Sequence, residues 1–118
     1  MTLFAPTDEA FGRLAPGTVE ALVKPENRDA LVKLLRLHMV SGRLTSAELL
    51  RRIAAGQTAL TTLGGETLTL SLTGAVVTLT DSGGNRSYVE TADVRQTNGV
   101  VHVVNGVLVP RLDPSPRP

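Results

Sequence analysis

The spacing of apolar residues changes near Gln57, from the period of helices to the alternation of β-strands. Before this point, apolar stripes predict helices over residues 8–14, 18–23 and 46–55, and another that begins at Pro25 and ends before Ser41. After it, alternating segments separated by glycine-containing turns predict strands over residues 57–63, 66–72, 75–81 and 87–92. A short strand over residues 2–6 precedes all of them and ends at a proline.

The most apolar segment, residues 98–110, is expected to lie in the middle of the core as two short strands. Under strict alternation one face carries Val100, His102 and Val104, and the other carries Val101 and Val103. Apolar residues on both faces are typical of a central strand that is covered on both sides. The pairs Asn98-Gly99 and Asn105-Gly106 favour turns, and Pro110 removes a backbone donor, so each end of the segment is marked.

Capping residues mark where three of the helices begin. Thr7 is a suitable N-cap for residues 8–14, with Asp8 in the first turn and Phe11 on the buried side. Thr18 is expected to cap the next helix, and Thr45 with Glu48 forms a capping-box sequence for residues 46–55. In the helix that begins at Pro25, the buried stripe is predicted to consist of Leu31, Leu34, Leu35 and His38.

This order of elements predicts an α+β domain over residues 1–110, in which two packed sheets lie at one end and the helices at the other. Residues 111–118 are proline-rich and are expected to form a disordered tail. At 118 residues the chain is long enough to bury roughly two thirds of the surface that it exposes when unfolded.

Composition excludes several classes of function. The chain has no cysteine, so disulfides, thiolate metal sites and cysteine nucleophiles are impossible. A net charge of +1 and only three aromatic side chains (Phe4, Phe11 and Tyr88) argue against nucleic-acid binding. We find no secretory leader and no apolar run of membrane-spanning length, so membrane association would require segments that this chain lacks. Abundant Arg, Ala, Gly and Leu are typical of a high-GC bacterial source.

Two segments resemble the hallmark blocks of the fasciclin domain family. Residues 2–11, Thr-Leu-Phe-Ala-Pro-Thr-Asp-Glu-Ala-Phe, match the first block, and residues 98–110 match the second in order, spacing and wording. Between them, residues 37–40 resemble the family's Tyr-His segment, with leucine in place of tyrosine. The residues that match the structural motifs are Thr7, Asp8, Phe11, His38, Asn98, Gly99, His102 and Pro110.

The resemblance implies a wedge of two β-sheets flanked by helices, with a binding activity and no catalytic residues. It implies an extracellular, secreted or cell-surface adhesion module, periplasmic in a Gram-negative cell, that binds a protein, matrix polysaccharide or a second copy. Some animal members bind integrins through an Asp-Ile pair that aligns here with Asp93-Val94, and a second proposed binding segment aligns with Leu37-His38. Residues 91–92 and Leu37 depart from those motifs.

The family usually has one or two helices before the first hallmark block, whereas this sequence begins with that block. Those helices normally cover part of the core. We therefore expect either a truncated chain or a domain that covers the exposed apolar surface by forming a dimer.

His38 and His102 are candidates for a metal pair or for acid-base catalysis, because histidine binds zinc and titrates near neutral pH. Their aliphatic neighbours favour structural roles instead, and we expect neither a metal nor a cofactor. Residues 82–85 are expected to form a hairpin turn rather than a phosphate-binding loop. Two alternatives to adhesion remain: a small-molecule, lipid or glycan-binding domain with an apolar groove, and a zinc-dependent enzyme.

Overall fold

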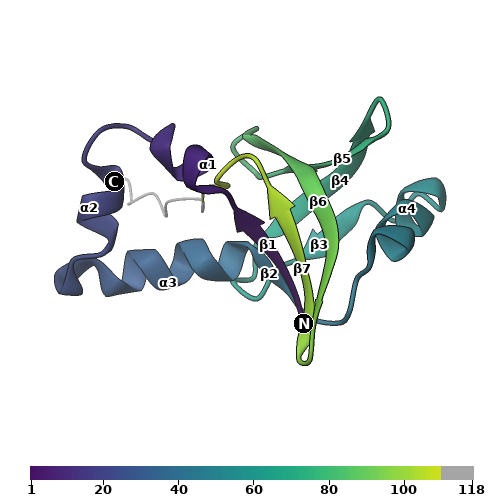
Figure 1. Cartoon of the computed structure of the whole chain (residues 1–118), viewed down its shortest axis with the longest axis horizontal. Helices are drawn as coiled ribbons and strands as arrows, with labels where there is room; N and C mark the ends of the chain where they lie inside the picture. The colour runs from purple at the N-terminus through teal and green to yellow at the C-terminus, as the bar shows by residue number, and fades with distance from the viewer. Residues whose placement is uncertain (110–118) are drawn as a thin grey trace, which may run out of the picture.

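The structure is a computed structural model that describes residues 1–109, with a sheet at its centre (Figure 1). Its elements in chain order are β1 (Thr2–Pro6), α1 (Asp8–Gly12), α2 (Thr18–Leu22), the 3-10 helix η1 (Pro25–Asn27), α3 (Arg28–Leu37), β2 (Met39–Val40), α4 (Ser46–Ala54), β3 (Ala59–Thr61), β4 (Thr67–Thr73), β5 (Val76–Thr80), β6 (Arg86–Gln96) and β7 (Gly99–Val104). Seven strands form the sheet in the order β2-β1-β7-β6-β5-β4-β3. The α+β class predicted from the sequence is confirmed.

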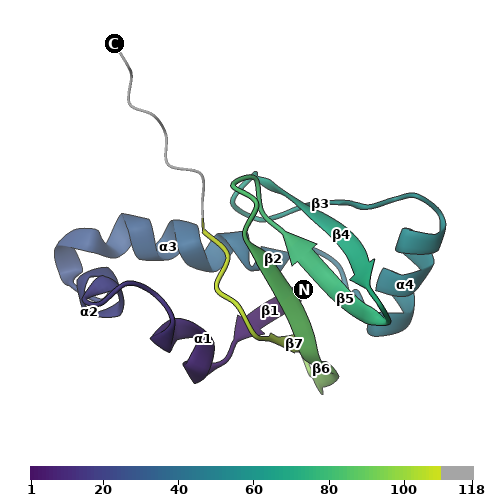
Figure 2. The same cartoon turned by 90° about the horizontal axis from the view of Figure 1, so that it is seen from above.

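The long strand β6 connects the two sheets that the sequence predicts into one bent sheet. Its first residues pair with β5, from Arg86 to Tyr88, and the rest pairs with β7 as far as Gln96. The two halves face one core, and Figure 2 shows them as the two sides of a wedge. The core consists of Phe4, Leu37, Val40, Leu44, Leu49, Leu60, Leu68, Leu70, Val77, Leu79, Val104 and Leu108.

The two edges of the bent sheet nearly meet. Just past the end of β3, the amide of Leu63 donates to the carbonyl of Met39 in β2 over 2.8 Å. Both edge strands are short, which limits the unpaired backbone that the sheet presents to other chains. The result is an almost closed sheet with helices at both ends: α1, α2 and α3 lie at the left in Figure 1, and α4 lies at the right.

Strand β7 is central, as its sequence predicts, because it lies between β1 and β6. Val100, His102 and Val104 are all buried. The prediction of a second strand in residues 98–110 is wrong for the described part, since residues 107–109 are not in a strand. The reason is that the amides of Leu108 and Val109 donate to the side chains of His38 and Asp81 instead of to a neighbouring strand.

The N-terminal helices are shorter than expected, and one cap is wrong. Thr7 caps α1, because its hydroxyl accepts a hydrogen bond from the amide of Ala10. Thr18, however, lies inside α2 and not before it. Gly17 precedes that helix with a left-handed φ of 85°, a conformation that glycine adopts without strain, and it offers no capping side chain.

The buried stripe of α3 is rotated from its predicted position. Leu34 and His38 are buried as expected, but Leu35 is 46% exposed and Leu37 is only 1% exposed. The rotation follows from the helix end, since α3 continues directly into β2 and its last turn is held against the core. No described helix is long and apolar enough to cross a membrane. Pro110 and the predicted tail of residues 111–118 lie outside the described residues.

Candidate functional site

Asp93 occupies a distorted part of β6. It is the one residue other than glycine in residues 1–109 with a positive φ, at 62°, and the pairing of β6 with β7 shifts register on its N-terminal side. Such a bulge re-aims a side chain without ending the strand, which explains why β6 continues to Gln96 beyond its predicted end. Aspartate is among the few residues that tolerate this conformation.

The carboxylate of Asp93 is held by the beginning of α4. It accepts the amide hydrogen of Ser46 at 2.7 Å and the hydroxyl of the same residue at 2.5 Å. These two bonds lower the pKa of Asp93 from its usual value, and the bond from the hydroxyl has the larger effect. Asp93 therefore connects the β6 bulge to a helix that begins 47 residues earlier in the chain.

His102 also links β6 to the loop before α4. Its Nε2 donates to the carbonyl of Leu44 over 2.6 Å, and its Nδ1 accepts the amide of Asp93 at 3.2 Å. The ring also stacks on Phe4, with centroids 5.5 Å apart. Ser46, Asp93 and His102 are thus close together, but both ring nitrogens bond to backbone groups and neither accepts the serine proton, so the three do not form a catalytic triad.

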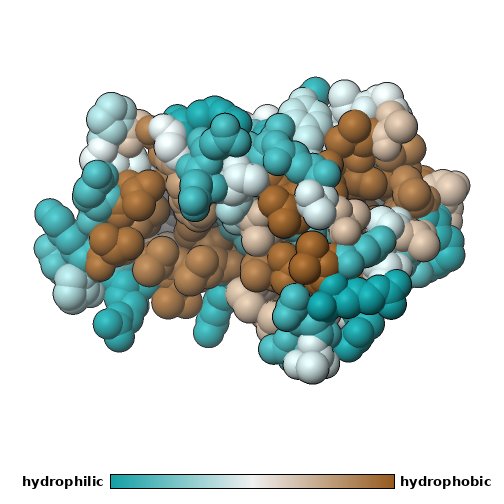
Figure 3. Space-filling view, in the orientation of Figure 1, coloured by the Kyte–Doolittle hydropathy of each residue, from teal (hydrophilic) through white to brown (hydrophobic). Residues whose placement is uncertain are grey.

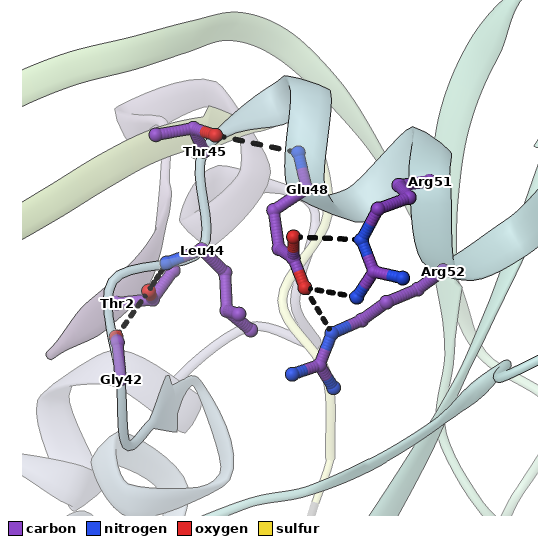
Figure 4. A network of polar contacts seen from close by, with 7 residues as sticks. All are labelled: Thr2, Gly42, Leu44, Thr45, Glu48, Arg51 and Arg52. Atoms are coloured by element: carbon purple, nitrogen blue, oxygen red, sulfur yellow. Dashed lines mark hydrogen bonds and ion pairs between the residues drawn. The ribbon is translucent and has the colours of Figure 1, made fainter.

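A second set of polar contacts fixes the loop that leads into α4 (Figure 4). The buried hydroxyl of Thr2 donates to the carbonyl of Gly42 and accepts the amide of Leu44, each over 2.8 Å. Thr45 caps α4 through the amide of Glu48, so half of the predicted capping box is present.

The other half of the capping box is absent, because the carboxylate of Glu48 binds two arginines of α4. Arg51 donates to it in a two-point contact at 3.0 and 2.7 Å, and Arg52 donates through Nε at 3.1 Å. The hydrogen bonds from Arg51 and then Arg52 lower the pKa of Glu48 to about 2. Positive charge on this face of α4 is thereby partly neutralised.

His38 holds the segment that follows β7. Its Nδ1 donates to the carbonyl of Leu34 over 2.8 Å, and its Nε2 accepts the amide of Leu108 at 2.9 Å. The ring is buried, and desolvation lowers its pKa, although the bond to Leu34 and the charge of Asp81 oppose that shift. The next amide, that of Val109, donates to Asp81 over 2.9 Å.

Leu37 lies in the core next to His38, so both predicted binding residues of this segment point inward. The ring nitrogens of His38 bond to backbone groups, and the side chain of Leu37 packs in the core, so neither residue is available to a partner. In residues 1–109 no three His, Asp or Glu side chains are grouped so that they could hold a metal ion. The Ser82–Asn85 loop is a turn around the carboxylate of Asp81, which accepts the amides of Gly83 and Asn85.

The remaining hallmark residues lie at turns and at the surface. Gly99 is buried where a Cβ atom would overlap the carbonyl of Met1, and Asn98 is exposed beside it. Asp8 is exposed in the first turn of α1, and Phe11 is half-buried.

The outer side of the β2-β1-β7-β6 half carries an apolar row. Register places Met39 opposite Leu3, Leu3 opposite Val101, and Val101 opposite Val94. These side chains alternate with the buried ones, so they point away from the core and are half-buried or exposed. A groove of about 250 Å³ opens beside them, and Met1, Gln96 and Asn98 also line it.

Figure 3 shows apolar side chains over α2 and α3 and over β1 and β7, and a further apolar area over the β4–β5 hairpin. We call the surface over α2, α3, β1 and β7, without the hairpin, the apolar face. We define it by the row of Met39, Leu3, Val101 and Val94 together with the exposed valines and leucine of and next to the helices, Val19, Val23 and Leu35, of which Val23 is 65% exposed. Val101 was already assigned by alternation to the face of its strand opposite Val100, His102 and Val104.

The family model for the fasciclin domain matches residues 1–110. The chain belongs to the fasciclin domain family. This agrees with the resemblance of its two hallmark segments, so that interpretation of the sequence is confirmed.

Several proteins share this domain. Protein sll1483 from Synechocystis sp. is 42% identical over 111 residues, which cover 94% of this chain and 56% of that protein. Periostin from Homo sapiens is 29% identical over 109 residues, which cover 92% of this chain and 12% of periostin. The chain thus spans about half the length of the first relative and a small part of the second.

A solved pair of domains from the insect cell adhesion molecule fasciclin I matches 91% of this chain and 36% of its own, with a TM-score of 0.66 and 24% identity. At that identity the match shows a shared fold. The fasciclin domain described here has the same α+β architecture.

Proposed function

We propose that this fasciclin domain is an extracellular adhesion module that makes contacts with proteins or matrix, and that one of its partners is a second copy of itself. Its membership of the family supports a binding role rather than an enzymatic one. The solved relative is described as a cell adhesion molecule, which supports adhesion as the outcome of binding.

The observation that carries the proposal is the apolar face. Val23 and Leu35 are 65% and 46% exposed on the helices, and they lie on elements that flank the outer row of β1 and β7. Large exposed apolar patches on soluble domains mark interaction sites. An apolar contact surface also needs a rigid support, and the buried sheet beneath the row provides it.

Charge supports a second copy as the occupant. The helical segment contains equal numbers of acidic and basic residues: Asp8, Glu9, Glu20, Glu26 and Asp29 against Arg13, Lys24, Arg28, Lys33 and Arg36. Two copies that meet through this segment therefore experience no net repulsion between like charges. A two-fold dimer would place the same face of each copy in contact.

Within this proposal Asp93 and Val94 have different roles. Val94 is 36% exposed and belongs to the apolar face, where it contacts the partner. Asp93 fixes the β6 bulge through Ser46 and so positions Val94. Leu37 and His38 support the scaffold from inside.

Light scattering over a wide concentration range tests self-association. We expect a dimer that dissociates on dilution, and a monomer at every concentration for the Val23→Lys/Leu35→Lys variant. The control is Leu72→Lys, since Leu72 is 43% exposed on the β4–β5 hairpin outside the apolar face. A monomeric wild type, or a dimer weakened equally by both substitutions, would contradict the contact between copies.

Coated beads test adhesion itself. Beads that carry the wild-type domain are expected to cluster, whereas beads that carry the double variant stay dispersed. If wild-type beads neither cluster with one another nor attach to a surface coated with matrix proteins, the adhesive role is wrong.

The groove of about 250 Å³ favours a second candidate, the binding of a small apolar ligand or glycan. It is slightly smaller than common ligand pockets, which start at about 300 Å³, and it is shared with the apolar face. A thermal-shift screen with sugars and lipids distinguishes the two functions. A zinc enzyme has less support, since the nitrogens of both histidines are engaged, and a stoichiometric zinc content of the purified protein would revive it.

A further inference from the structure

A separate pocket of about 280 Å³ lies between α3 and the turn that joins β3 to β4. Its walls are formed by Val32, Lys33 and Arg36 from the helix and by Leu63, Gly64 and Glu66 from the turn, and the buried Leu37 closes its floor. No residue of the apolar face lines it, so the pocket is independent of the function proposed above.

The pocket is held open by backbone contacts. Leu63 donates to Met39, Thr62 donates through its amide and its hydroxyl to the carbonyl of Glu66, and the amide of Gly65 donates back to Thr62. Gly64 lies against α3, where an added Cβ would be 3.5 Å from the Cβ of Arg36. A pocket that is already formed requires little ordering when a ligand binds.

The helix wall is positively charged, and its two cations are not paired within the part of the chain that the structure describes. Neither Lys33 nor Arg36 forms an ion pair with any of residues 1–109, unlike Arg51 and Arg52, which bind Glu48. Glu66 lies on the opposite wall, and its carboxylate accepts the hydroxyl of Ser82 at 3.4 Å. The pocket therefore has a cationic side and an acidic side.

Two aliphatic side chains are exposed at the same place. Val32 is 37% exposed and Leu63 is 42% exposed, one on each wall. Aliphatic rather than aromatic side chains line the pocket, which disfavours stacking on a nucleobase or sugar ring. Burying an aliphatic group between Val32 and Leu63 is favourable in proportion to the apolar area removed from water.

We infer that this pocket binds an acidic peptide segment in which an aliphatic residue adjoins a carboxylate. The carboxylate binds Lys33 and Arg36, where guanidinium geometry allows a two-point contact. The aliphatic side chain of the peptide lies between Val32 and Leu63. The volume admits one or two side chains, so the segment is short and its affinity is modest.

The test uses NMR titration of the full chain with the peptide acetyl-Leu-Asp-Leu-Glu-amide, and with acetyl-Leu-Asn-Leu-Gln-amide as the neutral probe. We expect shifts of the amides of residues 32–36 and 63–66 with the acidic peptide. Affinity should fall at least about tenfold for the neutral peptide and for the Lys33→Glu/Arg36→Glu variant. It should also fall as salt is raised, because exposed charges are screened.

The matched control is Lys24→Glu/Arg28→Glu, which makes the same change of net charge outside the pocket and should alter affinity less than about twofold. Equal losses in the two double variants would mean that only net charge matters, and would overturn the proposal. Shifts elsewhere, no shifts, or equal affinity for the neutral peptide would overturn it as well. If the charge-reversed variant does not fold, Lys33→Gln/Arg36→Gln provides the same comparison.

Discussion

The strand half of this fasciclin domain and its N-terminal helical segment bury their apolar residues to very different degrees. In the strands, Leu68, Leu70 and Leu79 are at most 1% exposed, and the two parts of the bent sheet cover one another. In the helical segment, α2 and η1 have no buried residue at all. Aliphatic side chains are thus buried in the strand half and exposed or half-buried in α2.

The two regions differ in whether their apolar side chains are fully covered within the domain. The sheet almost closes on itself, with one backbone hydrogen bond between Leu63 and Met39, and its inner face is covered by the shared core. The outer row and the helices have no such cover within the described residues. Binding is therefore expected where burial is incomplete, and stability where it is complete.

Two leucines in α3 give the largest expected contrast. Leu37→Ala removes a core side chain and should lower the free energy of unfolding by about 2 to 5 kcal/mol. Leu35→Ala removes an exposed one and should change it by less than about 0.5 kcal/mol. Urea denaturation at a concentration at which the domain is monomeric measures both, and similar losses there would mean that Leu35 is also part of a core.

Two glycines, one crowded and one in open space, give a second comparison between the strand half and the helical segment. A Cβ atom at Gly106 would be 2.9 Å from the carbonyl oxygen of Arg86, so Gly106→Ala should cost about 1 to 3 kcal/mol. Gly12 has no atom within 4 Å of that position and lies in α1. Gly12→Ala should therefore stabilise the domain by about 0.5 to 1 kcal/mol. Thermal unfolding compares them, and a stable Gly106→Ala variant would show that the turn relaxes.

His38 gives the smallest effect, which depends on pH. Burial lowers its pKa in the folded state below the unfolded value of 6.5. The unfolded chain therefore binds a proton first, so the stability that His38 contributes is complete above pH 6.5 and declines as the pH falls below it. The decline is at most about 1.4 kcal/mol per pH unit.

The control for this effect is His38→Gln, which lacks the titrating group. The stability gap between wild type and variant should narrow from pH 7.5 to pH 5.5, as measured by urea denaturation at each pH. A gap that stays constant over this range would mean that the ring has an ordinary pKa.

Local patterns predicted most of the fold. Alternation located five of the strands, Thr7 and Thr45 marked two helix starts, and the central position of β7 followed from its valines. Errors arose where tertiary contacts decided the outcome. The end of α3 is rotated because it leads into β2, and residues 107–109 leave the sheet because His38 and Asp81 take their amides.

The candidate site was less predictable, because its residues are distant in sequence. Asp93 was identified by its place before β7, but its partner Ser46 lies 47 positions earlier and was not indicated by any local pattern. The same holds for Thr2, which binds Leu44 from 42 positions away. Periodicity assigns a side chain to a face, whereas the choice of hydrogen-bond partner depends on the assembled chain.

The parallel pairing of β1 with β7 has a consequence for how this protein is made. Thr2 lies beside Val100, so β1 finds its central neighbour only after all the residues between them have been translated. Contacts between residues so far apart slow folding, because a long loop must close before they form. The edge of β1 that pairs with β7 therefore stays open while the hairpins from β3 to β6 are being completed, and an unpaired strand edge is prone to aggregation during that interval.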